Sequence, residues 1–152
     1  MAPRALPLRN ARLIVLALVL GIVIFAGLVV FLRLSSDTAL NPEVGKLLLV
    51  VIGGLAVSNS VVYFLLRKSF VARAQEAKAE ALELLKQDAM PPQLFSLTII
   101  GAALAEGVGL LGVVAVLLGA PWFALAAPAV AVVLMVAQLP TREKLERVVR
   151  GV

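Results

Sequence analysis

Glu106 is an acidic residue in the middle of a long apolar run. The run Leu94–Leu118 has 25 residues, and Glu106 at its middle is the only charged one. At about 1.5 Å per residue, a helix of this length spans ~37 Å and can cross a hydrocarbon layer of about 30 Å. Placing a charged side chain at the centre costs roughly 2.5–3.5 kcal/mol even on lenient insertion scales. We therefore expect the Glu106 carboxyl group to have a function or a hydrogen-bonding partner.

Two roles for this carboxyl group fit its position. As a neutral group it would donate a hydrogen bond to a neighbouring helix, and as a functional group it would be an ion or proton site or a docking point. Asn59 is the other strongly polar side chain deep in an apolar run, but it lies a turn or more from the depth of Glu106. Residues 53–55 are predicted to lie level with Glu106. The residues expected to support the site are Asn59, Ser58, Ser60, Gly109 and Ala102.

Small residues form stripes that favour close packing between helices. At 3.6 residues per turn, one stripe follows the Glu106 helix and a second follows the apolar run 47–66. Small side chains let two backbones approach closely, which drives helix association in lipid. We expect these stripes to pack against copies of the chain or against a partner. Their members are Gly101, Ala105, Gly112 and Gly119 on the first helix, and Gly53 and Ala56, with Ser60, on the second.

The composition excludes most catalytic chemistry. Cysteine and histidine are both absent, which removes disulfides, thiol and imidazole catalysis and the common zinc sites. The glycine-rich segment 107–112 lies inside an apolar run rather than after a strand, so it does not predict a dinucleotide site. We expect a protein that is not an enzyme and that has no metal site and no cofactor.

The apolar content predicts an all-α integral membrane protein. The 152 residues are 62% hydrophobic and 15% charged, with a mean hydropathy of +1.06; soluble domains are nearer 45–50% apolar and 25% charged. We predict a single four-helix transmembrane domain over residues 1–152. Its spans are predicted at 13–32, 47–66, 94–118 and 122–139, with an amphipathic connector helix at about 69–87 and a C-terminal surface helix at 142–150. Thr141 and Gly151 are the expected caps of that last helix.

The distribution of basic residues predicts the orientation. Of the 14 lysines and arginines, only Arg33 and Lys46 flank the apolar runs on one side. The other 12 fall on the opposite side, at Arg4, Arg9 and Arg12, at Arg67, Lys68, Arg73, Lys78 and Lys86, and at Arg142, Lys144, Arg147 and Arg150. The positive-inside rule then places both termini and the connector in the cytoplasm. Because the basic residues flank apolar runs, the net charge of +5 predicts a membrane partner and no nucleic acid.

Two resemblances accompany these features. The segment Ala103–Leu118, in which Gly112 follows Glu106 by six residues, resembles the ion-carrying helix of the ring-forming c subunits of rotary ATPases, the proteolipids. That resemblance implies reversible protonation or cation binding at Glu106 against a neighbouring subunit, although Leu111 stands where the family usually has tyrosine. As a whole, the chain resembles a group of uncharacterised small bacterial four-span membrane proteins, on segments 103–107 and 140–144. This resemblance implies a multi-pass protein of the bacterial inner membrane.

Three functions remain open from the sequence. The first is a membrane subunit that forms a homo-oligomer or a complex with other membrane subunits, with Glu106 donating a hydrogen bond between helices. The second is a proton- or cation-translocating element with Glu106 as the titrating site. The third is a membrane-surface adaptor that uses its basic cytoplasmic helices to bind anionic lipid or a cytoplasmic protein.

Overall fold

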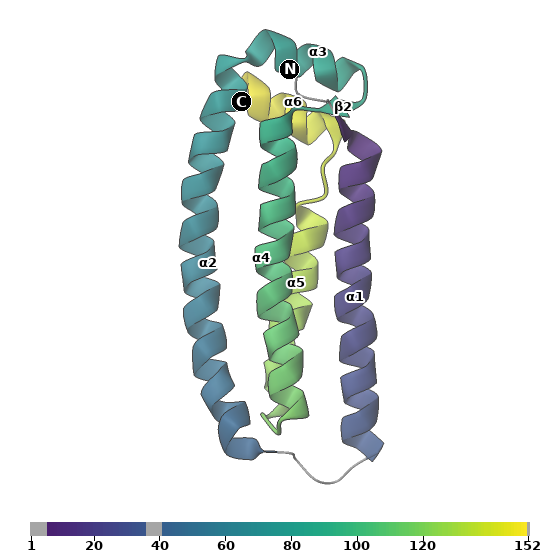
Figure 1. The fold of residues 1–152 in the computed structure, drawn as a ribbon, viewed down its shortest axis with the longest axis vertical. Helices are drawn as coiled ribbons and strands as arrows, with labels where there is room; N and C mark the ends of the chain where they lie inside the picture. Colours follow the sequence, from purple (N-terminus) through teal and green to yellow (C-terminus); the bar gives the residue numbers. More distant parts are fainter. Residues whose placement is uncertain (1–5, 36–40, 152) are drawn as a thin grey trace.

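The computed structural model describes residues 6–35 and 41–151 as a bundle of long helices with a cap of short elements at one end (Figure 1). Arg4, counted above in the charge distribution, lies outside the described residues. In chain order, the helices are α1 (Leu8–Ser35), α2 (Pro42–Glu76), α3 (Lys78–Lys86), α4 (Pro92–Leu117), the 3₁₀ helix η1 (Trp122–Leu125), α5 (Ala126–Ala137) and α6 (Arg142–Arg150). Two residues of β1 (Leu6–Pro7) pair antiparallel with β2 (Ala89–Met90).

Helix α4 is the centre of the bundle. It packs against α1, α2 and α5, and Figure 1 shows α1 and α2 on its two flanks with α5 behind it. The sequence of α4 explains this position, because its buried residues include Gly101, Ala102, Gly109 and Gly112, which let neighbouring helices approach its backbone. A middle cluster joins α1, α4 and α5 through Val15, Ile22, Ala102, Ala131 and Met135.

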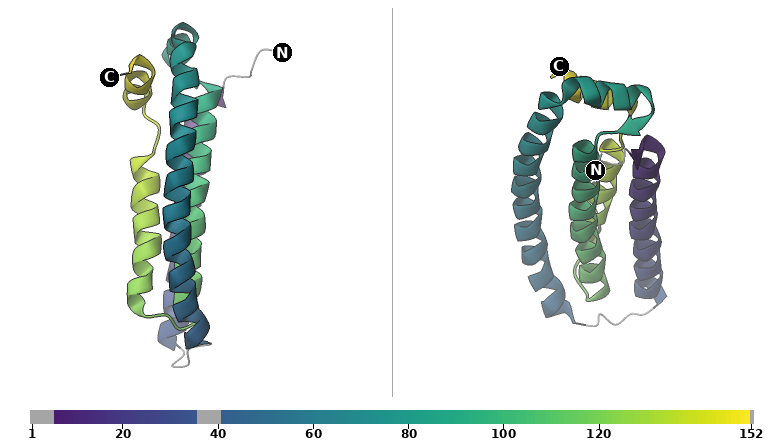
Figure 2. Two further views of the ribbon diagram at one scale, coloured as in Figure 1. Left: turned by 90° about the vertical axis from the view of Figure 1, so that its left-hand side faces the viewer. Right: turned by 45° about the horizontal axis from the view of Figure 1, so that its top comes forward.

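The cap lies at the end of the bundle that holds the start of α1 and helices α3 and α6 (Figures 1 and 2). Its core contains side chains from five helices and from β2. They are Leu8 and Ala11 of α1, Ala74 of α2, Ala81 and Leu85 of α3, Met90 of β2, Leu94 of α4, and Leu145 and Val149 of α6. The antiparallel pairing of Leu6 with Met90 closes this cap.

Three helices, α1, α2 and α4, are long and apolar enough to cross a membrane. A fourth span requires that the segment Trp122–Ala137 and helix α6, which are bent by 75°, be counted together. Helix α4 covers the predicted range 94–118 to within two residues, whereas α5 ends at Ala137 and begins with a 3₁₀ turn. Pro128 lies in the first turn of α5, where a missing N–H is well tolerated, rather than in the middle of a helix.

The connector differs from its prediction. No single helix covers residues 69–87: α2 continues for 35 residues to Glu76, and the short α3 follows after a break at Ala77. Ala77 has φ −94° and ψ 34°, and neither glycine nor proline signals this break in the sequence. At ~1.5 Å per residue α2 is ~52 Å long, so it projects well beyond a hydrocarbon layer of about 30 Å. Helix α3 then packs against α6, which gives the connector a partner within the chain.

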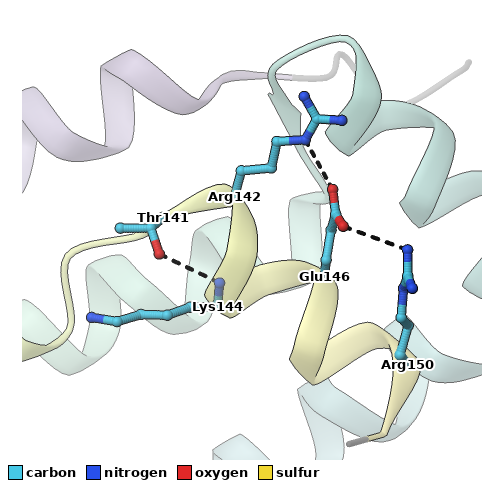
Figure 3. Close-up of polar contacts among 5 residues, drawn as sticks. All are labelled: Thr141, Arg142, Lys144, Glu146 and Arg150. Carbon is cyan, nitrogen blue, oxygen red and sulfur yellow. Dashed lines mark hydrogen bonds and ion pairs between the residues drawn. The ribbon is translucent and has the colours of Figure 1, made fainter.

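Helix α6 has the bounds and caps expected from the sequence, and Figure 3 shows its N-terminal cap at Thr141 and the ion pairs of Glu146. The Thr141 hydroxyl oxygen accepts a hydrogen bond from the Lys144 backbone N–H at 3.4 Å, and Gly151 ends the helix with φ 78°. Glu146 pairs with Arg142 at 2.9 Å and with Arg150 at 3.5 Å. The hydrogen bond from Arg142, aided by the positive charges of Arg142, Arg150 and Lys86, holds the pKa of Glu146 below its ordinary value.

Candidate functional site

Glu106 lies in the middle of α4, one turn after Ala102, which packs against α1 and α5. Its side chain is half-buried, and none of the hydrogen bonds or ion pairs found among the described residues involves it. Ala102, one turn before it, is fully buried in the middle cluster, whereas Ala103 and Gly107 are exposed. Ala103, Glu106 and Gly107 together form a strip of α4 that no other part of the described chain fully covers, and we call it the open strip. A methyl group added at Gly107 would meet nothing within 4 Å.

Asn59, predicted to support Glu106, binds elsewhere. Its side-chain amide donates a hydrogen bond to the Leu104 carbonyl at 3.2 Å, so it joins α2 to α4. Because α2 and α4 run antiparallel, this contact places Glu106 level with Val57 rather than with residues 53–55. Leu104 is two residues, or about 200°, from Glu106 around the helix. Helix α2 therefore packs on the side of α4 away from Glu106.

The other predicted supporting residues do not gather around the carboxyl group. The Ser60 hydroxyl donates to the Ala56 carbonyl within α2 at 2.7 Å, and Ser58 is exposed. Gly109 faces Ala131 of α5 and Ile22 of α1, at 2.9 and 3.2 Å from the position of an added Cβ. Of the predicted supporting set, only Ala102 and Gly109 share the Glu106 side of α4.

The small-residue stripe of α4 is used within the chain. A Cβ at Gly112 would lie 2.7 Å from the Ala127 Cβ and 2.8 Å from the Pro128 Cδ, so this glycine lets α5 pack closely. A Cβ at Gly101 would lie 2.7 Å from the Tyr63 ring, and Gly119 forms the turn after α4 with φ 106°. These contacts are internal, so this stripe of α4 is not the face left free for a partner.

The stripe of α2 is mostly open. A Cβ at Gly53 or Gly54 would meet nothing within 4 Å, and large apolar side chains on this helix, such as Val50, Val57 and Phe64, are more than 60% exposed. Ile52 is the large apolar residue of α2 that is buried in the bundle core. Helix α2 therefore presents most of its apolar surface outward.

A groove of about 520 Å³ runs between α2 and α5, with α4 as its floor. The floor consists of Gly101, Leu104, Ala105 and Val108, on the side of α4 away from Glu106. Most of the walls are apolar. The wall residues are Ile52, Ala56, Asn59, Ser60, Tyr63, Phe64 and Arg67 of α2, together with Ala126, Ala127, Val130, Ala131, Leu134 and Gln138 of α5 and its end.

The end of this groove nearest the cap is polar. Tyr63, Arg67 and Gln138 line both this groove and a smaller cavity of about 200 Å³ beneath the cap, which Lys144 also lines. The Gln138 side-chain oxygen is buried and has no hydrogen-bond partner among the described residues. Lys144 donates to the Ala137 carbonyl at 3.2 Å, at the C-terminal end of α5. The sequence does not predict this meeting, because Tyr63 and Arg67 of α2 are more than 70 positions away from Gln138 and Lys144. Gly101 lets two of them approach, since its added Cβ would lie 2.6 Å from the Gln138 oxygen and 2.7 Å from the Tyr63 ring.

Arg33 has a specific role at the opposite end of the bundle. Its guanidinium group donates to the Val116 carbonyl at 3.1 Å and lies 5.9 Å from the centroid of the Trp122 ring. This carbonyl near the end of α4 already accepts from the Gly119 N–H at 3.0 Å, so Arg33 is its second donor, and the nearby Trp122 ring adds a cation–π contact. Arg33, one of the two basic residues outside the main cluster, therefore ties α1 to the turn that follows α4.

Together, the fold and these sites define a helical bundle with several apolar helices, compatible with an integral membrane protein. No protein-family model, curated protein or solved structure matches this chain.

Proposed function

We propose that this protein is an integral membrane subunit that forms a homo-oligomer through the open strip of α4 around Glu106. The observation that carries the proposal is the half-buried Glu106 side chain, which lies in an apolar helix without a hydrogen-bond partner among the described residues. A carboxyl group in hydrocarbon is stabilised when a neighbouring helix supplies a hydrogen-bonding group. A second copy of the chain would supply it.

The surface next to Glu106 supports close approach of another helix. Ala103 and Gly107 are small and exposed, and the space beyond Gly107 is open. A neutral Glu106 can donate to a backbone carbonyl of the facing helix, and intramembrane hydrogen bonds of this kind contribute about 0.6 kcal/mol on average and ~1.7 kcal/mol at most. Close packing over the small residues would supply the rest of the association energy.

The other two functions have less support. Neither of the two cavities described above includes Glu106 in its lining, so no described path for an ion reaches the carboxyl group. Helix α6 has basic residues suited to a membrane surface, but its apolar residues Leu145 and Val149 are already buried against α3. Localisation in a bacterial inner membrane is part of our proposal and rests on the resemblance stated in the sequence analysis, and the positive-inside distribution supports a cytoplasmic cap.

Site-specific cross-linking tests the proposal, because the natural chain has no cysteine. We expect the purified Ala103→Cys variant, reconstituted into lipid membranes, to form disulfide-linked dimers. Val133→Cys serves as the matched control, because Val133 is 66% exposed on α5 but lies away from the strip. Equal cross-linking of both variants would show random collision and would contradict the proposed interface.

The contribution of the carboxyl group is tested in the Ala103→Cys background. Glu106→Gln keeps a hydrogen-bond donor, so we expect cross-linking to persist, whereas Glu106→Leu removes the donor and should reduce it about three- to tenfold, within the range of one intramembrane hydrogen bond. If Glu106→Leu cross-links as well as the natural residue, the carboxyl group does not hold the oligomer together.

A further inference from the structure

We propose that the groove between α2 and α5 binds one anionic phospholipid from the surrounding bilayer. An acyl chain would occupy the apolar part of the groove, and the phosphate of the headgroup would lie between Arg67 and Lys144. This inference does not depend on the proposed oligomer, because the groove and Glu106 lie on different sides of α4.

The apolar part of the groove matches a hydrocarbon chain. Its walls are formed by side chains such as Ile52, Phe64, Val130 and Leu134, and Ala105 and Val108 of α4 lie on its floor. Val130 is 56% exposed and Leu134 is 48% exposed, although both lie in an apolar helix. A lipid acyl chain in this groove would therefore cover apolar side chains that the protein itself leaves exposed.

The charge at the cap end of the groove favours an anion. Arg67 and Lys144 line the cavities here, and no aspartate or glutamate does. Neither cation forms an ion pair in the part of the chain that the structure describes. Arg67 directly follows the apolar run 47–66, so it lies at the depth of lipid headgroups, where basic pockets between helices bind anionic lipids.

Gln138 adds a specific polar contact at the same place. Its buried side-chain oxygen has no partner among the described residues, and a buried acceptor without a hydrogen bond is destabilising. Because Gln138 lines both cavities, a rotation of its side chain would turn this oxygen toward the groove, where a headgroup hydroxyl, as in phosphatidylglycerol, would donate to it. Arg67, Lys144 and Gln138 thus lie at one end of the groove. The remaining lining is apolar apart from Asn59 and Ser60, whose side chains already donate to the Leu104 and Ala56 carbonyls. This distribution of polarity resembles that of a phospholipid.

Native mass spectrometry of the full chain in detergent tests the headgroup site, with phosphatidylglycerol and phosphatidylcholine of identical acyl chains as probes. We expect the natural chain to retain phosphatidylglycerol preferentially. The double variant R67Q/K144Q should lower the affinity for phosphatidylglycerol roughly 25-fold, at about fivefold for each basic residue near the headgroup. The variant K68Q/R147Q removes the same charge from residues that do not line the groove and should keep the preference. An equal loss in both double variants would indicate diffuse attraction and would overturn the proposal.

A second pair of variants tests the chain-binding part. Val130→Trp fills the groove and should lower retention of both lipids at least fivefold, whereas Val133→Trp on the same helix lies outside the groove and should not. Both positions are exposed, so both variants should fold, which circular dichroism and elution volume will check. Unchanged retention in Val130→Trp would overturn the proposal. A second result would also overturn the proposal. If the natural chain retained no lipid but formed a dimer, and Val130→Trp abolished that dimer, the occupant of the groove would be a second copy of the chain.

Discussion

The contact between α4 and α5 at Gly112 gives a prediction that the structure makes quantitative. Gly112→Ala adds one methyl group, and Gly107→Ala adds the same group five residues earlier on the same helix. Around Gly107 there is nothing within 4 Å of the new Cβ. Around Gly112 the new Cβ would lie 2.7 Å from the Ala127 Cβ, 2.8 Å from the Pro128 Cδ and 3.1 Å from the Ala124 carbonyl oxygen. The two variants therefore have the same chemistry and different surroundings.

The expected loss follows from these distances. Carbon atoms pack at about 3.5–4.0 Å, so α5 must move away by roughly 1 Å, and a gap of 0.5–1 Å already forfeits a quarter to a half of the dispersion energy of each contact. The neighbouring atoms belong to a proline ring, an alanine Cβ and a backbone carbonyl, none of which can rotate away. Overpacking of this kind costs about 1–3 kcal/mol. We expect Gly112→Ala to lower the free energy of unfolding by that amount.

The measurement is reversible unfolding in mixed micelles, followed by the fluorescence of Trp122, the single tryptophan of the chain. In a membrane-like solvent the helices remain formed when they separate. Gly107 belongs to the open strip, so the comparison is made at a detergent excess that keeps the chain monomeric, and there Gly107→Ala should change the free energy of unfolding by less than about 0.5 kcal/mol. The reasoning would be refuted if the two variants were equally stable, or if Gly112→Ala were the more stable one. Either result would mean that α5 does not pack on α4 at Gly112.

Three further predictions concern other contacts. Asn59→Leu removes the hydrogen bond to the Leu104 carbonyl and should lower the free energy of unfolding by about 0.6 kcal/mol, and by ~1.7 kcal/mol at most, in the same unfolding assay; a stabilised variant would contradict the bond. Met135→Ala empties a fully buried position in the middle cluster and should cost about 2–5 kcal/mol, whereas the exposed Val133→Ala should cost far less. Because the pKa of Glu146 is lowered in the folded protein, its stabilisation of α6 is present above the ordinary glutamate pKa and lost as pH falls through the lowered value. Amide hydrogen exchange in α6 should therefore accelerate at low pH in the natural chain, relative to more distant helices, and should show no such step in Glu146→Gln.

The features of the fold that depend on neighbouring residues could be predicted from the sequence. The apolar run around Glu106 predicted α4, and Thr141 and Gly151 predicted the caps of α6, because capping is decided within one turn of helix. Gly119 was expected on the small-residue stripe of the Glu106 helix, but it lies in the turn after α4 and has the positive φ that favours glycine.

The features that depend on distant residues could not. The break at Ala77 has no local signal, because it arises where α3 folds over to pack on α6. The pairing of Leu6 with Met90 joins segments more than 80 residues apart. Small-residue stripes predict close packing but not the partner, so the internal use of Gly101 and Gly112 was missed. The partner of Asn59 was also missed, because the offset between α2 and α4 along the bundle is set by their packing and not by where the two apolar runs end.

The composition of the cap core has a consequence for how the protein is made. Leu8 and Ala11, near the beginning of the chain, are buried together with Leu145 and Val149, near its end. Arg12 also donates to the Pro140 carbonyl at 2.8 Å, a contact between residues 128 positions apart. The ribosome synthesises the first helix long before the last, so the cap end of α1 stays incomplete until translation of α6 is finished. The first long helix to be made is thus among the last to reach its final packing.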